Sequence, residues 1–190
     1  MAIASAIQLL RHGETAAGQA FIGSSDVALT ARGWQQMHSA VSDVTCDRII
    51  SSPLQRCAAF AETLAAARGV PVLYEPRWCE LDFGAWEGRT AAELMQTEAA
   101  ALQELWARPE AFVAPAGEAV AAFRRRVLAA WAEHGRADAG RTLVVTHGGV
   151  IRVLLAALYP DHYASIMHID VPHGSVHALA GAAPAVERPA

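Results

Sequence analysis

An arginine, a histidine and a glycine stand together at positions 11 to 13, directly after an apolar run typical of a buried strand. A histidine at a strand end directs its imidazole into the crevice beyond the sheet, and neutral imidazole is a competent nucleophile towards phosphorus. The guanidinium of Arg11 offers a planar fork that matches two phosphate oxygens. Gly13 permits a tight turn and the close approach of a ligand. Arg11 and His12 therefore predict an anion site, and the alternative is a surface pair in a loop.

A second histidine follows another apolar run. His147 stands after the strand-like residues 142–146 and before Gly148 and Gly149, at the expected junction of a strand and a helix. Free backbone N–H groups at the start of a helix favour anions, so His147 is well placed to contact one. The alternative is a core histidine whose ring is merely hydrogen-bonded.

The charged residues restrict the chemistry. All 15 cationic residues are arginine and the chain has no lysine, which excludes Schiff-base chemistry, a lysine-containing P-loop and the ATP-binding lysine of kinases. A net charge of −4 provides no global basic field for nucleic acid or membranes.

Three cysteines without C-x-x-C spacing indicate neither a disulfide framework nor a zinc site. The N-terminal apolar run has no basic residues before it and is too short to span a bilayer, so we expect a cytoplasmic protein.

The elements that must position these residues alternate between strands and helices. This alternation predicts an α/β fold, a three-layer α/β/α sandwich with a mostly parallel central sheet, in which ligands bind beyond the carboxyl ends of the strands. A chain of 190 residues suits a single domain spanning 1–190. Strands are expected at 3–10, 48–51, 70–74, 142–146, 166–171 and 175–179, and helices at 31–41, 53–68, 91–107, 118–133 and 148–158.

Together these motifs resemble the histidine phosphatase superfamily, with its phosphoglycerate mutase-like fold. The Arg-His-Gly motif matches the family's phosphorylated histidine, and three further elements follow in the family's order: Ser52 to Arg56, the acidic segment 80–88 and the motif around His147. The resemblance implies a metal-independent phosphomonoesterase that needs no cofactor and acts through a phosphohistidine. Its substrate would be a small phosphorylated metabolite.

The resemblance also assigns roles. His12 would attack phosphorus, Arg11 and Arg56 would bind the phosphate, and His147 would stabilise the transferring phosphoryl group. Protonation of the leaving alcohol needs a partly desolvated carboxylic acid, and Glu80 matches the family's proton donor by its place in the motif. Asp82 is the competing candidate.

Two positions depart from the family pattern. Gly18 stands where family members often have an asparagine that helps to bind phosphate. In this chain the phosphate contact of that asparagine would be absent or supplied by the backbone, and Gly23 is the candidate for a backbone contact. His173 precedes Gly174 where an asparagine is common, and both a substrate contact and a structural role are open.

Within the family, the chain looks most like bacterial alpha-ribazole-5′-phosphate phosphatases of cobalamin synthesis. The alternatives are a broad-specificity sugar or nucleotide phosphatase and a phosphoglycerate mutase-like enzyme, although the short chain favours hydrolysis. A non-catalytic binding protein and a metal-dependent hydrolase are rivals from other classes, and a homodimer is an open alternative. The residues that raise the metal alternative are His162, His168, Asp170, His173 and His177.

Overall fold

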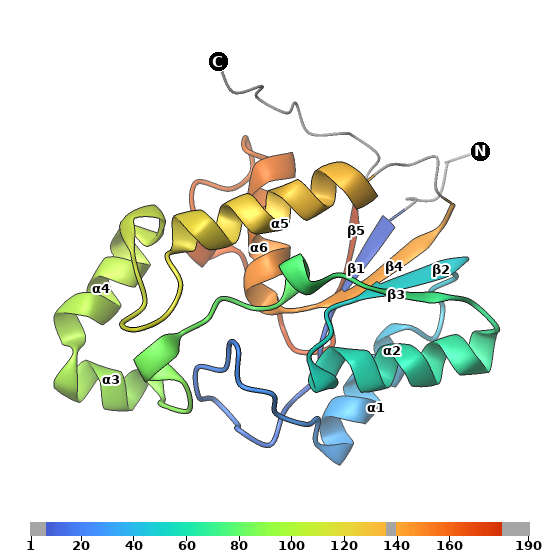
Figure 1. Ribbon diagram of the computed structural model, residues 1–190, viewed down its shortest axis with the longest axis horizontal. Coiled ribbons are helices and arrows are strands. Elements are labelled where there is room, and N and C mark those ends of the chain that lie inside the picture. Colours follow the sequence, from blue (N-terminus) through green and yellow to red (C-terminus); the bar gives the residue numbers. More distant parts are fainter. Residues whose placement is uncertain (1–6, 136–139, 180–190) are drawn as a thin grey trace.

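The computed structural model describes residues 7–135 and 140–179 and contains one five-stranded sheet (Figure 1). The strand order is β3-β2-β4-β1-β5, with four parallel strands and β5 antiparallel to β1. The strands are β1 (Ile7–Arg11), β2 (Arg48–Ser51), β3 (Val72–Tyr74), β4 (Thr142–Thr146) and β5 (Val176–Leu179). The α-helices are α1 (Ala31–Ala40), α2 (Gln55–Arg68), α3 (Ala91–Thr97), α4 (Ala99–Ala107), α5 (Val120–His134) and α6 (Gly148–Leu158).

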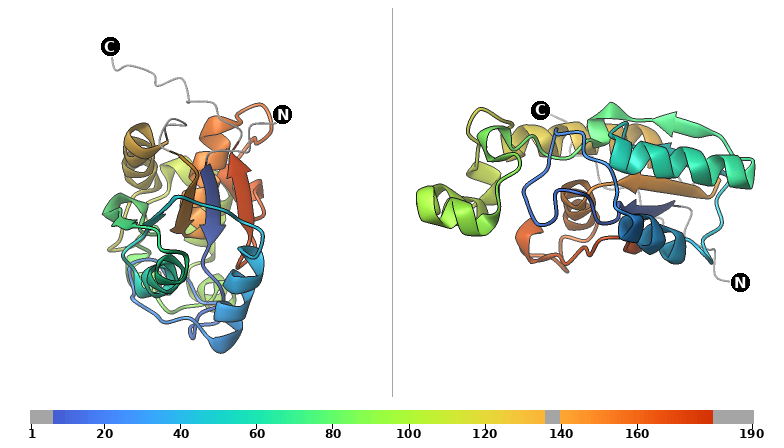
Figure 2. Two further views of the ribbon diagram at one scale, coloured as in Figure 1. Left: turned by 90° about the vertical axis from the view of Figure 1, so that its right-hand side faces the viewer. Right: turned by 90° about the horizontal axis from the view of Figure 1, so that it is seen from below.

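Helices cover both faces of the sheet, as the alternating pattern predicts. Alternate residues of one strand enter different cores: Leu143 and Val145 pack with α1 and α2, whereas Val144 packs with α5 and α6. The views in Figures 1 and 2 show α1 and α2 on one side of the sheet and α5 and α6 on the other. The fold is therefore the expected three-layer α/β/α sandwich.

The register of the central strands decides where the functional residues lie. Arg11 at the end of β1 pairs with Thr146 at the end of β4, so His12 and His147 both follow directly after paired strand ends. In the same way Ser51 of β2 pairs with Val145. Ser52 therefore leaves the sheet beside the two histidines, at the carboxyl edge where such folds bind ligands.

The expected strand at 166–171 is wrong. The chain there forms the short 3₁₀ helix η5 (Ile166–His168), and the Ser165 side chain caps it by accepting from the N–H of Met167 at 3.2 Å. The following carbonyls have side-chain partners instead of a neighbouring strand. Arg152 donates to Ile169 O at 2.9 Å and Arg11 donates to Val171 O at 2.5 Å. Arginines of the site region therefore compete with sheet formation in this segment.

The expected helix at 91–107 is interrupted at Glu98, whose backbone leaves helical geometry (φ −142°, ψ 35°). The Glu98 carboxylate accepts from Trp86 Nε1 at 2.6 Å and from Arg89 at 2.5 Å, and these bonds hold the break against the 80–90 segment. Helix α2 begins at Gln55 rather than at Pro53. Residues 3–6 of the first expected strand lie outside the described residues.

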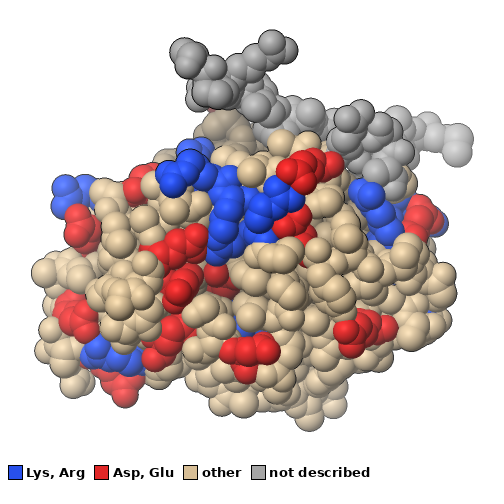
Figure 3. Space-filling model, in the orientation of Figure 1, with Lys and Arg blue, Asp and Glu red and all other residues tan. Residues whose placement is uncertain are grey.

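No helix in the described ranges has both the length and the apolar character needed to cross a membrane. On the face drawn in Figure 3, a group of arginine side chains gathers in the upper middle, with acidic side chains directly beside it.

Candidate active site

His12 is nearly buried and its ring has a defined orientation. Its Nδ1 lies 2.8 Å from the carbonyl oxygen of Gly13, a group that can only accept, so Nδ1 carries the proton and Nε2 keeps its lone pair. Burial and the nearby Arg56 guanidinium hold the pKa of His12 well below the ordinary imidazole value. His12 is therefore a neutral imidazole at physiological pH. A Cβ at Gly13 would lie 2.1 Å from Gly33 O, so this turn requires glycine.

His147 lies beside His12, with 5.2 Å between the ring centroids. Arg56 Nε donates to its Nδ1 at 3.2 Å, so Nε2 carries the proton and donates to Ser52 Oγ at 2.8 Å. Burial and the Arg56 charge lower the pKa of His147 well below its ordinary value. Both ring nitrogens of His147 are thus engaged by protein groups, and only His12 offers a free lone pair.

Arg56 is a fully buried cation at the start of α2. Its terminal nitrogens donate to Gly23 O at 2.7 Å and to Ser25 O at 2.8 Å. Within residues 7–135 and 140–179, no carboxylate pairs with this guanidinium. A buried charge without an opposite charge is costly, and a dianionic phosphate would supply the missing one.

Arg11 approaches the same place from β1. Its Nη1 donates to Val171 O and its Nη2 donates to His173 Nε2 at 2.9 Å. Its Nε is buried and has no hydrogen-bond partner among the described residues, so this N–H can donate to an anion. His173 lies 5.5 Å from His12 by ring centroids, and burial and the Arg11 charge lower the pKa of His173 to about 4. His173 thus accepts from Arg11 as a neutral ring.

Glu80, from the segment between η1 (Pro76–Trp78) and η2 (Gly84–Trp86), contacts the first turn of α6, which follows His147 directly. Its Oε2 accepts from the N–H of Gly149 at 2.9 Å and its Oε1 from the N–H of Leu81 at 3.0 Å. A Cβ at Gly149 would lie 2.1 Å from Glu80 Oε1, so glycine is needed for this approach. Asp82 instead accepts from Ser24 Oγ at 3.0 Å and from the N–H of Gly84 at 2.9 Å, and it fixes a loop. The geometry favours Glu80 over Asp82 as the acid of the site.

The loop at 23–25 folds around a carboxylate of this chain. Glu87 is half-buried and accepts from the N–H groups of Gly23, Ser24 and Ser25 at 2.9 to 3.3 Å. Gly23 thus uses its N–H for Glu87 and its carbonyl for Arg56. A phosphate contact from Gly23 stays a prediction.

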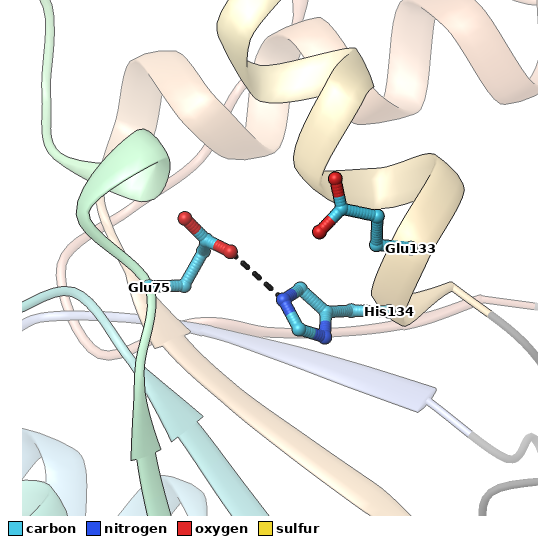
Figure 4. Close-up of side chains that lie close together, drawn as sticks. All are labelled: Glu75, Glu133 and His134. Carbon is cyan, nitrogen blue, oxygen red and sulfur yellow. Dashed lines mark hydrogen bonds and ion pairs between the residues drawn. The ribbon is translucent and has the colours of Figure 1, made fainter.

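The C-terminal histidines proposed as metal ligands are not gathered into one cluster. His173 contacts Arg11, and His177 Nε2 lies 2.8 Å from Ser175 Oγ. Among the described residues, the group whose ligand atoms lie within 4.8 Å of one another is Glu75, Glu133 and His134 (Figure 4). There Arg77 donates to both carboxylates, at 2.6 and 2.7 Å, so this group is a neutralised ion-pair network rather than a metal site.

We expect this network to stabilise the fold in a pH-dependent way. Hydrogen bonds from the Arg77 side chain lower the pKa of Glu75 from 4.5 to about 2, so the stabilisation is complete above pH 4.5 and is lost as the pH falls towards 2. Arg77→Met should lower the free energy of unfolding at pH 7 by more than the loss of an exposed ion pair does, and it should have a much smaller effect at pH 3. Urea denaturation at both pH values measures this.

Arg108→Met is the matched control, because Arg108 forms an exposed i,i+4 pair with Glu104. Such pairs contribute only about 0.3–0.5 kcal/mol. An Arg77→Met effect no larger than that of the control, or one that does not shrink in acid, contradicts the assignment.

Comparison with known proteins decides the family. The sequence profile of the histidine phosphatase superfamily (branch 1) matches residues 7–183. The chain belongs to the histidine phosphatase superfamily. It is thus a phosphatase, and the family and fold expected from the four motifs are confirmed.

The relatives of this phosphatase include proteins named as alpha-ribazole phosphatases and proteins named as phosphoglycerate mutases. The adenosylcobalamin/alpha-ribazole phosphatase of Escherichia coli is 33% identical over 180 residues, covering 90% of this chain and 87% of the relative. The "Probable phosphoglycerate mutase GpmB" of Yersinia enterocolitica is 35% identical over 162 residues, covering 81% and 75%. The crystal structure of the alpha-ribazole phosphatase from Shigella flexneri superimposes with a TM-score of 0.75 at 32% identity, covering 90% and 87%.

The structure unites Arg11, His12, Arg56, Glu80 and His147 at one edge of the sheet. Sequence reasoning missed Ser52 as the partner of His147. The position of Ser52 could have indicated this role, because Ser52 follows directly after a predicted strand, as both histidines do. It also missed Arg152, whose guanidinium lies near that of Arg11.

Proposed function

We propose that this phosphatase hydrolyses small phosphomonoesters through a phosphohistidine on His12. One observation carries the proposal: the neutral His12 has a free lone pair on Nε2, and the buried guanidinium of Arg56 lies beside it. Among the described residues, no carboxylate forms an ion pair with Arg56. The nucleophile and the fixed positive charge that a phosphoryl transition state needs are thus adjacent.

In the first step, the lone pair of His12 Nε2 forms a bond to phosphorus as the ester P–O bond breaks. The electron pair of that bond stays on the alcohol oxygen, which takes the proton of Glu80. Arg11 and Arg56 stabilise the charge on the equatorial phosphoryl oxygens. His147, whose Nδ1 is held by Arg56, can donate its Nε2 proton to the same oxygens in place of Ser52 Oγ.

In the second step, the Glu80 carboxylate takes a proton from water as the water oxygen attacks phosphorus. The P–N bond breaks and returns its electron pair to Nε2, and inorganic phosphate leaves. The enzyme is then back in its starting protonation state. Glu80 is thus the general acid of the first step and the general base of the second, and water replaces the proton that Glu80 gave to the alcohol.

For the substrate we propose alpha-ribazole-5′-phosphate. Supporting this choice are two relatives named as alpha-ribazole phosphatases that align over 90% of the chain. The similarity to a protein named as a phosphoglycerate mutase makes 3-phosphoglycerate the substrate to compare.

The test is steady-state turnover with EDTA present, on alpha-ribazole-5′-phosphate, p-nitrophenyl phosphate and 3-phosphoglycerate. We expect activity unaffected by EDTA, acid-labile protein-bound phosphate after quenching, and the highest kcat/KM for alpha-ribazole-5′-phosphate. Loss of activity with EDTA overturns the mechanism. Conversion of 3-phosphoglycerate to 2-phosphoglycerate identifies a mutase, and phosphate binding without turnover identifies a binding protein.

A further inference from the structure

An apolar pocket of about 120 Å³ opens beside Glu80. Its walls come from segments far apart in the sequence and include Phe21, Phe83, Phe123 and Met167, and its polar lining includes Glu80 and Arg152. Phe21 and Phe83 pack with their ring centroids 4.9 Å apart. Aromatic and thioether walls of this kind bury flat apolar groups well.

Arg152 lies between this pocket and the phosphate-binding residues. A Cβ at Gly148 would lie 3.3 Å from both Arg11 Nε and Arg152 Nη1, so the two guanidiniums meet above this glycine. Arg152 Nε donates to Ile169 O at 2.9 Å, whereas its terminal nitrogens form no hydrogen bond with any described residue. They can donate to an oxygen of a bound molecule.

Glu80 also lines a second cleft, but this one suits a phosphate ester poorly. Its lining adds the carboxylates of Asp82 and Glu118 to that of Glu80, against one guanidinium, Arg126. Arg126 is itself paired with Glu118 at 2.8 Å. A dianionic ester would meet like charges there, whereas the apolar pocket has Arg152 near Arg11.

We propose that the apolar pocket binds the alcohol part of the substrate and selects phosphomonoesters whose alcohol carries an aromatic ring. In this arrangement Arg152 donates to an oxygen of the alcohol part, between the ring and the phosphate. The proposal rests on the proposed function, because a group protonated by Glu80 must lie next to Glu80. It adds Phe21, Met167 and Arg152 as specificity-determining residues.

The test compares 2-phenylethyl phosphate with ethyl phosphate, two primary alkyl esters that differ by a phenyl ring. We expect the wild-type kcat/KM to favour 2-phenylethyl phosphate by about 30-fold, within the range for apolar groups in a fitted pocket. Phe21→Leu and Met167→Ala should each lower this ratio by about tenfold, mainly through the KM of the phenylethyl ester. Met95→Ala is the matched control, because Met95 is exposed on α3 and does not line the pocket.

A wild-type ratio near one, or a ratio that both pocket variants leave unchanged, overturns the proposal. Acid-labile phosphoenzyme is measured in the same samples. If it forms while the ratio is near one, the phosphohistidine mechanism stands and only the pocket assignment fails. If none forms although ester is hydrolysed, the mechanism itself fails.

Discussion

Replacing His12 with alanine should lower kcat by roughly 10⁴- to 10⁶-fold and abolish the acid-labile phosphoenzyme, as expected for the loss of a catalytic nucleophile. No neighbouring group can replace it. The ring nitrogens of His147 are engaged by Arg56 and Ser52, and those of His173 include the acceptor for Arg11. Steady-state turnover of p-nitrophenyl phosphate and acid-quenched phosphate incorporation measure the two effects.

Two further variants make this result interpretable. His12→Gln keeps a polar side chain in the buried position and should be as inactive as His12→Ala, which separates the chemistry from a packing defect. His162→Ala removes an exposed histidine and should retain wild-type turnover. Phosphoenzyme that persists in both His12 variants means that another residue is the nucleophile.

Much of the site could be predicted from the sequence, because its histidines and Arg11 lie at the carboxyl ends of neighbouring parallel strands. Arg11 and Thr146 are register partners, so two histidines that each follow a strand end must lie side by side, although 135 positions separate them. The helix expected at 31–41 likewise begins where a local signal places it, because the Thr30 side chain accepts from the N–H of Gly33 at 3.0 Å and caps the helix. Local chemistry decides both features.

Long-range side-chain contacts account for what the sequence did not predict. The apolar segment 166–171 has the composition of a strand, yet Arg152 and Arg11 donate to two of its carbonyls, those of Ile169 and Val171. Glu98 interrupts a helical stretch because Trp86 and Arg89 bind its carboxylate. Such contacts join residues that no periodic pattern links.

Replacing Glu80 with glutamine should have effects that depend on the leaving group. Glutamine retains an oxygen to accept from the N–H of Gly149 but supplies no acidic proton. For ethyl phosphate, whose alcohol must be protonated as it leaves, we expect kcat to fall by roughly 10²- to 10⁴-fold, the usual contribution of general acid catalysis. Little phosphoenzyme should accumulate with this ester, because the first step has become slow.

With p-nitrophenyl phosphate the same variant should show a burst, since p-nitrophenolate leaves without a proton while the base for the second step is missing. Stopped-flow release of p-nitrophenol and trapped phosphoenzyme should agree in amplitude. Asp82→Asn is the matched control: it alters only the loop held by Ser24 and Gly84, so it should show no burst. A burst in Asp82→Asn, with Glu80→Gln behaving as wild type, transfers the acid–base role to Asp82. Glu80 and Asp82 are only two residues apart, so a substitution at either position could lower activity. The dependence on the leaving group shows which of the two carboxylates is the acid and base of the reaction.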